Sequence, residues 1–292
     1  MSKTNLNKHL HLHLLVFIWG FTAILGALIS IDAVPLVWYR MLIASALTLV
    51  YFLIRKKPLK VPPKALIKFM ITGLLIAIHW IAFFSAIKVA NVSVALVTMS
   101  TGALFASLIE PLFFRRRIRF SEIFFGAVVM AGLYIIFRVD SGYSLGIVYA
   151  LIAAALSALF SVLNGLYIQR YEAGIISFYQ LSFGVVFISA YLLFNNGFIP
   201  DTFVLKGHDL LYLLILGSIC TAYAFIASIN IMKYLTPYTV MLTVNLEPVY
   251  GILLAVLIFG EKEKMSPAFY LGGAIIMLTV IANGLLNRKK NP

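Results

Sequence analysis

The sequence predicts an all-α integral membrane protein with ten transmembrane helices, arranged as two inverted five-helix repeats with both termini in the cytoplasm. Three observations lead to this fold class: the composition, a series of ten apolar segments and a weak internal duplication. Of the 292 residues, 62% are hydrophobic and only 11% are charged, with a mean hydropathy of +1.01. A soluble domain has about 25% charged residues because its surface must face water. The exterior of this chain is therefore expected to face lipid.

The apolar segments have about the length of roughly 20 residues that a helix needs to cross the hydrocarbon core of a bilayer. Charged residues are rare within them, and they do not alternate as the strands of a membrane barrel do. Helices are the remaining structure that satisfies every backbone polar group in lipid. The predicted spans are 11–30, 34–54, 66–87, 91–114, 120–138, 144–169, 174–194, 209–232, 236–260 and 266–287.

The distribution of Lys and Arg predicts the orientation of these spans. If the N-terminus is cytoplasmic, 17 basic residues fall on the inner side, 5 fall on the outer side and Arg40 lies within a span. Basic loops remain in the cytoplasm, so this difference favours two cytoplasmic termini. Two termini on one side of the membrane require an even number of spans, and the ten predicted spans meet this requirement.

The internal duplication joins segments that lie 145 residues apart. Residues 87–99 align with 232–244, which pairs Lys88 with Lys233, and residues 120–132 align with 265–277 after one inserted residue. Half of ten spans is five, an odd number, so the second half enters the membrane from the opposite side. Inverted repeats are typical of alternating-access carriers. The expected repeats are 11–138 and 144–287.

Several motifs resemble the EamA-type permeases of the drug/metabolite transporter superfamily. They are FIWGFTAILG at 17–26, Pro35 followed by Arg40, and LEPVYGILLAVLIFGE at 246–261 with the MSPAFYLGGAIIM that follows it. The first half departs from the family pattern, with Gly102 where a proline is usual. The resemblance implies that spans one to four and six to nine surround a central cavity, with spans five and ten as outer supports.

Three of the ionisable residues inside predicted spans are candidates for the substrate site, because a charge at the helix centre costs about 2.5 to 3.5 kcal/mol. Glu247 lies at mid-depth before Pro248, which removes a backbone donor and loosens the preceding turn. It is interpreted as a proton-coupling or substrate-binding group, or else as a structural partner of Arg40 or a protonated acid. Arg40 can hold a substrate carboxylate or snorkel to the outer interface. His79 can bind substrate and relay protons, or be a neutral imidazole bonded to a neighbouring helix.

Aromatic and uncharged polar residues complete the predicted substrate site. Trp19 and Trp80 are candidates for the walls around an apolar or aromatic solute, although packing within the bundle also explains them. Hydrogen bonds between helices account for many polar residues in any bundle. The other candidates therefore have both interpretations: Gln180, Asn164, Tyr223, Thr98 and Asn245.

Other function classes lack their sequence signatures. No phosphate-binding GxxxxGK[ST] motif occurs, and no cluster of catalytic carboxylates or histidines lies at one interface. No group of His, Cys and acidic residues has the spacing of metal ligands, so neither a metal nor a cofactor is expected. The net charge of +13 comes from short basic loops that act as topology signals, so no nucleic-acid partner is expected.

The sequence thus favours a secondary transporter of the inner membrane that moves a small organic solute, such as an amino acid, a related metabolite or a drug, by export or exchange. A channel-like facilitator is the alternative, and an integral membrane enzyme acting on a lipid-linked substrate is less favoured. The expected partners are the solute and the bilayer. Small residues let helices approach closely, either in a homodimer or within one chain; the candidates are Gly126, Gly132, Gly272 and Gly273.

Overall fold

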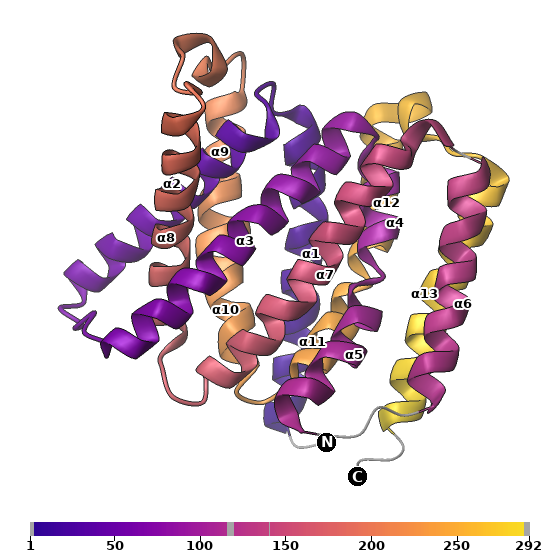
Figure 1. Cartoon of the computed structure of the whole chain (residues 1–292), viewed down its shortest axis with the longest axis horizontal. Coiled ribbons are helices and arrows are strands. Elements are labelled where there is room, and N and C mark those ends of the chain that lie inside the picture. The colour runs from indigo at the N-terminus through magenta and orange to yellow at the C-terminus, as the bar shows by residue number, and fades with distance from the viewer. Residues whose placement is uncertain (1–2, 116–119, 140, 289–292) are drawn as a thin grey trace.

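The computed structural model describes residues 3–115, 120–139 and 141–288, and every regular element in these ranges is a helix. Figure 1 shows the helices side by side, with both termini at the same end of the bundle. The first half contains α1 (Lys3–Leu28), α2 (Ala33–Ile54), α3 (Pro63–Val89), α4 (Val92–Met99), α5 (Gly102–Phe114) and α6 (Phe120–Val139). The second half contains η1 (Ser141–Tyr143), α7 (Ser144–Tyr167), α8 (Ala173–Phe194), η2 (Pro200–Phe203), α9 (Asp209–Gly217), η3 (Ser218–Tyr223), α10 (Ala224–Ile231), α11 (Pro237–Val244), α12 (Glu247–Phe259), η4 (Gly260–Glu263) and α13 (Pro267–Arg288).

Eight helical segments within the described ranges are long and apolar enough to cross a membrane. Their surface carries large apolar side chains, such as Leu257 at 81% exposure, as expected for a chain that faces lipid. The eight segments are Asn7–Leu28, Ala33–Ile54, Pro63–Val89, Val92–Phe114, Ser144–Tyr167, Ala173–Phe194, Asp209–Ile231 and Pro237–Glu263. They correspond to eight of the ten predicted spans.

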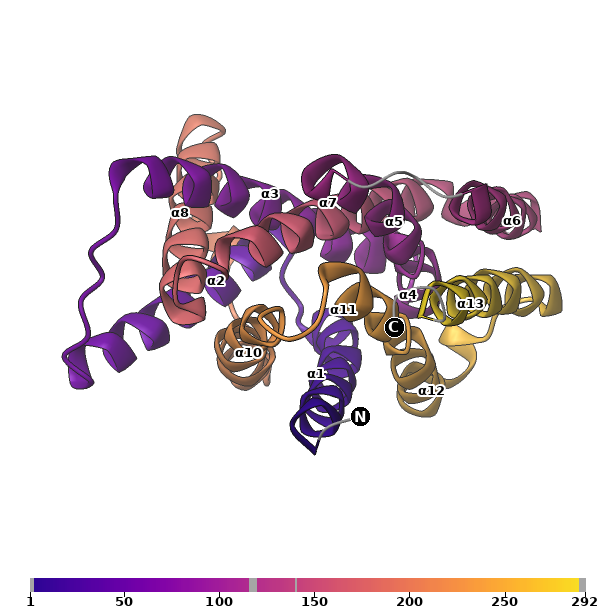
Figure 2. The same cartoon turned by 90° about the horizontal axis from the view of Figure 1, so that it is seen from below.

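The other two predicted spans, 120–138 and 266–287, form α6 and α13. The apolar parts that the structure describes within these helices are shorter, Phe124–Ile136 and Pro267–Thr279. Figures 1 and 2 show α6 and α13 packed against each other at one edge of the bundle. This is the place that the resemblance implied for spans five and ten.

Glycines join α6 to α13 within one chain. A Cβ atom added to Gly132 would lie 3.0 Å from the carbonyl oxygen of Gly272, and one added to Gly272 would lie 2.8 Å from that of Gly132. Gly126 faces Leu104, and Gly273 faces Val97. The four glycines that were candidates for close helix approach therefore make contacts within one chain.

Two spans are interrupted at matching positions. The segment Val92–Phe114 is divided into α4 and α5 at Ser100 and Thr101. The segment Pro237–Glu263 is divided into α11 and α12 at Asn245 and Leu246. Adding 145 to each boundary of α4 and α5 gives the boundaries of α11 and α12. The offset that was read from weak sequence similarity therefore recurs as a geometric offset between broken helices.

Hydroxyl groups and prolines account for these breaks. Ser100 Oγ donates to the carbonyl of Val97 at 2.6 Å, and Thr101 Oγ1 donates to that of Thr98 at 2.8 Å, so each carbonyl at the first break accepts a hydroxyl besides the backbone N–H of the same residue. In the second break Pro248 occupies the first turn of α12, where its missing N–H is not needed. The predicted loosening of the helix before Pro248 is observed.

Candidate functional site

A cavity of about 90 Å³ lies between the helices of both halves, next to the broken helices. Its volume holds several water molecules. Six of the ten residues predicted for the site line it: Trp19, Arg40, His79, Trp80, Asn164 and Glu247. The other lining residues are Thr22, Phe83, Met99, Ser157, Phe160, Ser161, Cys220, Phe225, Ser228, Met232, Val240, Met241 and Val244.

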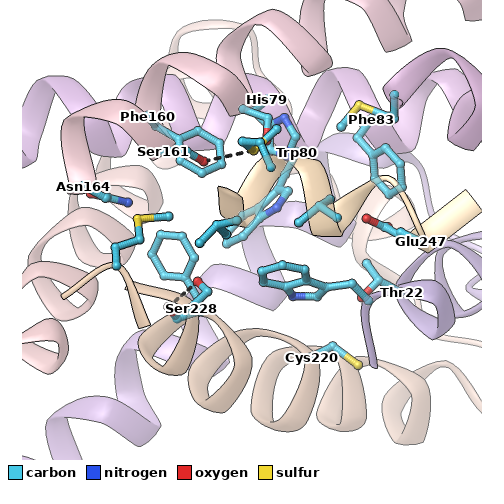
Figure 3. A pocket seen from close by; sticks show the side chains of 18 of the residues that line it. Thr22, His79, Trp80, Phe83, Phe160, Ser161, Asn164, Cys220, Ser228 and Glu247 are labelled. Carbon is cyan, nitrogen blue, oxygen red and sulfur yellow. Dashed lines mark hydrogen bonds between the residues drawn. The ribbon is translucent and has the colours of Figure 1, made fainter. Parts of the chain in front are cut away.

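Glu247 is the first residue of α12, directly after the break. The amino end of a helix carries a partial positive charge, which favours a carboxylate at this position. The side chain is half-buried and borders the cavity, and none of the described residues donates a hydrogen bond to its carboxylate. Figure 3 shows Glu247 beside Thr22 on one side of the cavity, with Asn164 on the far side.

Arg40 is held inside the bundle and does not snorkel. Its side chain is only 2% exposed, and its Nε donates to Thr221 Oγ1 at 2.6 Å. The guanidinium carbon lies 4.0 Å from the centre of the Trp80 ring, a cation–π arrangement. Its Nη1 has no hydrogen-bond partner within the described chain. A buried donor without a partner is costly, so this nitrogen is suited to donate a hydrogen bond to an acceptor on a bound solute.

A π-helical turn, η3, brings Thr221 to Arg40. Thr221 Oγ1 donates to the carbonyl of Leu216, five residues earlier, at 2.6 Å, so the hydroxyl both caps the widened turn and accepts from Arg40. Single π-helical turns occur frequently at functional sites. Gly217, just before the turn, allows α9 to approach α2, because a Cβ there would lie 2.7 Å from Ile43 Cβ. The local backbone geometry thus fixes the orientation of the guanidinium.

Arg40 and Glu247 do not pair with each other. No ion pair within 4.0 Å joins them in the part of the chain that the structure describes. The interpretation of Glu247 as a structural partner of Arg40 is therefore not what the geometry shows. The cavity instead has a basic and an acidic wall group, each with hydrogen-bonding capacity that the described residues do not use.

Aromatic side chains form much of the remaining wall. His79 Nδ1 lies 2.7 Å from the carbonyl of Ala153, which can only accept, so Nδ1 is the donor and the ring is tied to α7. The ring of His79 meets that of Phe160 edge-on, with centroids 5.2 Å apart, and Trp80 meets Phe225 in the same way at 5.9 Å. His79 therefore has the helix-bridging bond that was one of its two interpretations, while it also borders the cavity.

A stripe of small polar residues on α7 lines the side of the cavity away from Glu247. Ser157, Ser161 and Asn164 lie four and three residues apart, the spacing of one helix face. Figure 3 shows Ser161 and Asn164 on that side. This periodicity is visible in the sequence and could have identified the two serines, which the sequence analysis did not select.

Gln180 acts behind this stripe rather than in the cavity wall. It is fully buried on α8, and its Nε2 donates to Asn164 Oδ1 at 2.7 Å. Because the carbonyl oxygen of Asn164 is occupied, the amide orientation is fixed by Gln180. Gln180 is thus a positioning residue for a cavity-lining side chain.

The structure does not bring three other predicted residues to the cavity. Thr98 and Asn245 are buried at the helix breaks, and neither lines the cavity. Tyr223 is 46% exposed, and its hydroxyl lies 2.8 Å from His11 Nε2. Within the described residues no group of three or more His, Cys, Asp or Glu side chains could hold a metal ion.

The EamA-like transporter family profile matches residues 8–138 and 144–285, almost the whole chain in two blocks. The chain belongs to this family. It is 25% identical over 214 residues to an uncharacterized transporter from Clostridium kluyveri (strain ATCC 8527 / DSM 555 / NBRC 12016 / NCIMB 10680 / K1), covering 70% of this chain and 68% of that protein. This EamA-family protein is thus a multi-pass membrane transporter.

The fold of this EamA-family transporter is also found in a solved crystal structure. The two chains superpose with a TM-score of 0.69 at 19% sequence identity, over 96% of this chain and 98% of the other. An identity this low carries information about the fold alone. The predicted family resemblance and the membrane class are confirmed, whereas the solute has to be argued from the cavity.

Proposed function

We propose that this protein is a secondary carrier that moves a small zwitterionic solute of the amino-acid class across the inner membrane by alternating access. One observation carries the choice of solute: Arg40 and Glu247 border the same cavity, are opposite in charge and are not paired with each other. A carboxylate can accept from the free Nη1 of Arg40, and an ammonium can donate to Glu247. A zwitterion satisfies both wall groups at once.

The middle of the cavity suits a mostly apolar body of limited size. Its walls between the charged groups are formed by the rings of Trp19, Trp80, Phe160 and Phe225. The serines and Asn164 on the far side can receive a polar substituent. Met99, Met232 and Met241 also line the cavity, and their flexible side chains can adjust to the shape of the solute.

The proposed membrane arrangement is ten spans in two inverted repeats, 11–138 and 144–287, with both termini in the cytoplasm. The recurrence of the α4–α5 break in α11–α12 at the same offset supports the two repeats. The excess of 17 basic residues over 5 supports the orientation. In inverted-repeat carriers, substrate sites lie at discontinuous helices near the midplane.

Counterflow in proteoliposomes tests the proposed mode of transport. Vesicles loaded with unlabelled amino acid are diluted into a trace of labelled amino acid, and a carrier accumulates label transiently because exchange is faster than net flow. Export or exchange by a carrier predicts this overshoot. A channel-like facilitator gives simple equilibration without an overshoot, and that outcome would replace the carrier proposal.

A screen of amino acids, amines and carboxylic acids by thermal shift on purified protein tests the solute class. Zwitterions are expected to stabilise the protein more than the matched amine or carboxylic acid that lacks one charge, because each loses one of the two wall groups. Equal stabilisation by the monocarboxylic acid would remove Glu247 from substrate recognition.

A further inference from the structure

Two buried carboxylates that do not line the cavity lie at the end of the bundle opposite to the two termini. Asp209 is the first residue of α9, and Glu263 is the last residue of η4. Figure 1 shows the start of α9 and the η4 turn at the top of the bundle, with N and C at the bottom. Asp209 is 2% exposed and Glu263 is 4% exposed. Buried carboxylates are rare unless they hold something together.

Asp209 binds the link between α1 and α2. Its Oδ1 accepts from the backbone N–H of Ser30 at 2.9 Å, and its Oδ2 accepts from Ser30 Oγ at 2.5 Å and from the N–H of Lys206 at 2.9 Å. The Nζ of Lys88, at the end of α3, donates to the carbonyl of Ile29 in the same link. The start of α9 is thereby fastened to the first half of the molecule.

Glu263 caps the amino end of α4. Its Oε1 accepts from the N–H of Val92 at 3.0 Å, and its Oε2 accepts from the N–H of Ser93 at 2.9 Å and from Ser93 Oγ at 2.8 Å. Asn91 Oδ1 satisfies the next free donor, the N–H of Val94, at 2.8 Å. A carboxylate at this position also interacts favourably with the helix dipole. The carboxylate and its helix come from different halves of the chain.

We propose that Asp209 and Glu263 are the two latches of a gate that closes the cavity toward this end, a proposal that rests on the proposed alternating-access function. Both carboxylates belong to the second half, and five of their hydrogen bonds come from the first half. Halves that rock apart at this end must break these charge-assisted bonds. The latches therefore hold the conformation that is closed at the end away from the termini.

The contacts between the halves that the structure describes at the opposite end are of other kinds. They include the exposed ion pair of Lys57 with Glu172 at 2.5 Å, the bond from the Tyr179 hydroxyl to the carbonyl of Leu59 at 2.6 Å and the cation–π contact of Lys8 with Tyr234. Exposed ion pairs contribute little. The helix start equivalent to Val92 is Pro237, which has no N–H to offer a carboxylate. The carboxylate cap at the start of α4 therefore has no counterpart at the start of α11, and the two repeats differ at this point.

Cys220 is a natural reporter for this gate, because it is the single cysteine of the chain and lines the cavity. The membrane-impermeant reagent 2-(trimethylammonium)ethyl methanethiosulfonate is added to one side of proteoliposomes of known orientation. The thiolate forms a mixed disulfide and displaces methanesulfinate, and the modified fraction is measured by mass spectrometry. A Cys220→Ala variant gives the blank.

Glu263→Gln and Asp209→Asn are expected to raise the rate of Cys220 modification from the latch side about tenfold or more, since a charge-assisted bond is lost in each. Matched controls are two exposed carboxylates near the latches in the chain, Glu261→Gln in the same turn η4 and Asp201→Asn in η2, whose rates should equal wild type. Rates for Glu263→Gln and Asp209→Asn that equal those of the controls would overturn the proposal.

Milder variants keep the test valid if a latch variant does not fold. Ser93→Ala and Ser30→Ala each remove one hydroxyl donor and leave the carboxylates and backbone bonds in place, so a severalfold increase is expected. Thermal unfolding of each variant verifies that the fold is intact. The labelling uses no solute, so failure of the proposed function appears as absent counterflow in wild type, while failure of the latches appears as unchanged labelling.

Discussion

Replacing Arg40 with lysine is expected to weaken solute binding by about tenfold to about 150-fold, although the charge is kept. The guanidinium of Arg40 uses one nitrogen for the protein and leaves another for the solute: Nε donates to Thr221 Oγ1 at 2.6 Å, and Nη1 has no partner among the described residues. A lysine offers one nitrogen on a flexible stem and cannot hold both partners in this geometry. The lost bond to a carboxylate is charge-assisted, about 1.5 to 3 kcal/mol, and each 1.4 kcal/mol is a factor of about ten.

The assay is titration calorimetry on purified protein with the amino acid that gives counterflow. Arg55→Lys is the matched control, because Arg55 ends the same helix α2 and is exposed at its far end. Binding by the Arg40→Lys protein within about twofold of wild type would refute the reasoning, since 0.4 kcal/mol is less than any charge-assisted bond. An equal loss in Arg55→Lys would show that the effect is not local to the cavity.

Three further substitutions test other parts of the site. Glu247→Gln should weaken uptake and remove the decline of transport in acid that protonation of a solute-binding carboxylate predicts; a pH series of uptake rates that retains this decline would exclude Glu247. Gly217→Ala should destabilise the protein by about 1 to 3 kcal/mol through overpacking at α2, measured by thermal unfolding, whereas Gly142→Ala, with no atom within 4 Å of the added Cβ, should not. Gln180→Leu should weaken solute binding severalfold in calorimetry by releasing the amide of Asn164; unchanged affinity would show that this amide does not contact the solute.

Three of the six predicted residues that line the cavity are of the kinds that a membrane tolerates least. Arg40, His79 and Glu247 lie within apolar runs, where a charged or titratable group needs a protein or water environment. That constraint acts on the single residue and needs no knowledge of its neighbours. The break before Pro248 was predictable for the same reason, because proline removes a backbone donor wherever it stands.

Uncharged polar residues carried no comparable signal. Asn164 lines the cavity, Gln180 supports it from behind, and Tyr223 lies on the exposed surface with His11, although all three occur in similar apolar contexts. A neutral polar group in a helix bundle can be satisfied by any neighbouring helix. Its role depends on which helix is adjacent and on rotation about the helix axis.

Glu263 shows the same limit for a charged residue. It lies two residues after the exposed Glu261 in the stretch GEKE, and nothing in that stretch distinguishes a latch from a solvated loop carboxylate. Only the approach of the amino end of α4 buries Glu263 and supplies its donors.

The sequence by itself determined the helical membrane class, the 145-residue offset between the broken helices and the positions of the costly charges. These depend on hydrophobicity, chain chemistry and spacing along one chain, which are local properties. The tertiary structure alone decided that Arg40 and Glu247 face one cavity without pairing, that a π-helical turn presents Thr221 to Arg40, and that Asp209 and Glu263 fasten the two halves. Such features depend on contacts between residues more than a hundred positions apart, and these are set by how whole helices pack.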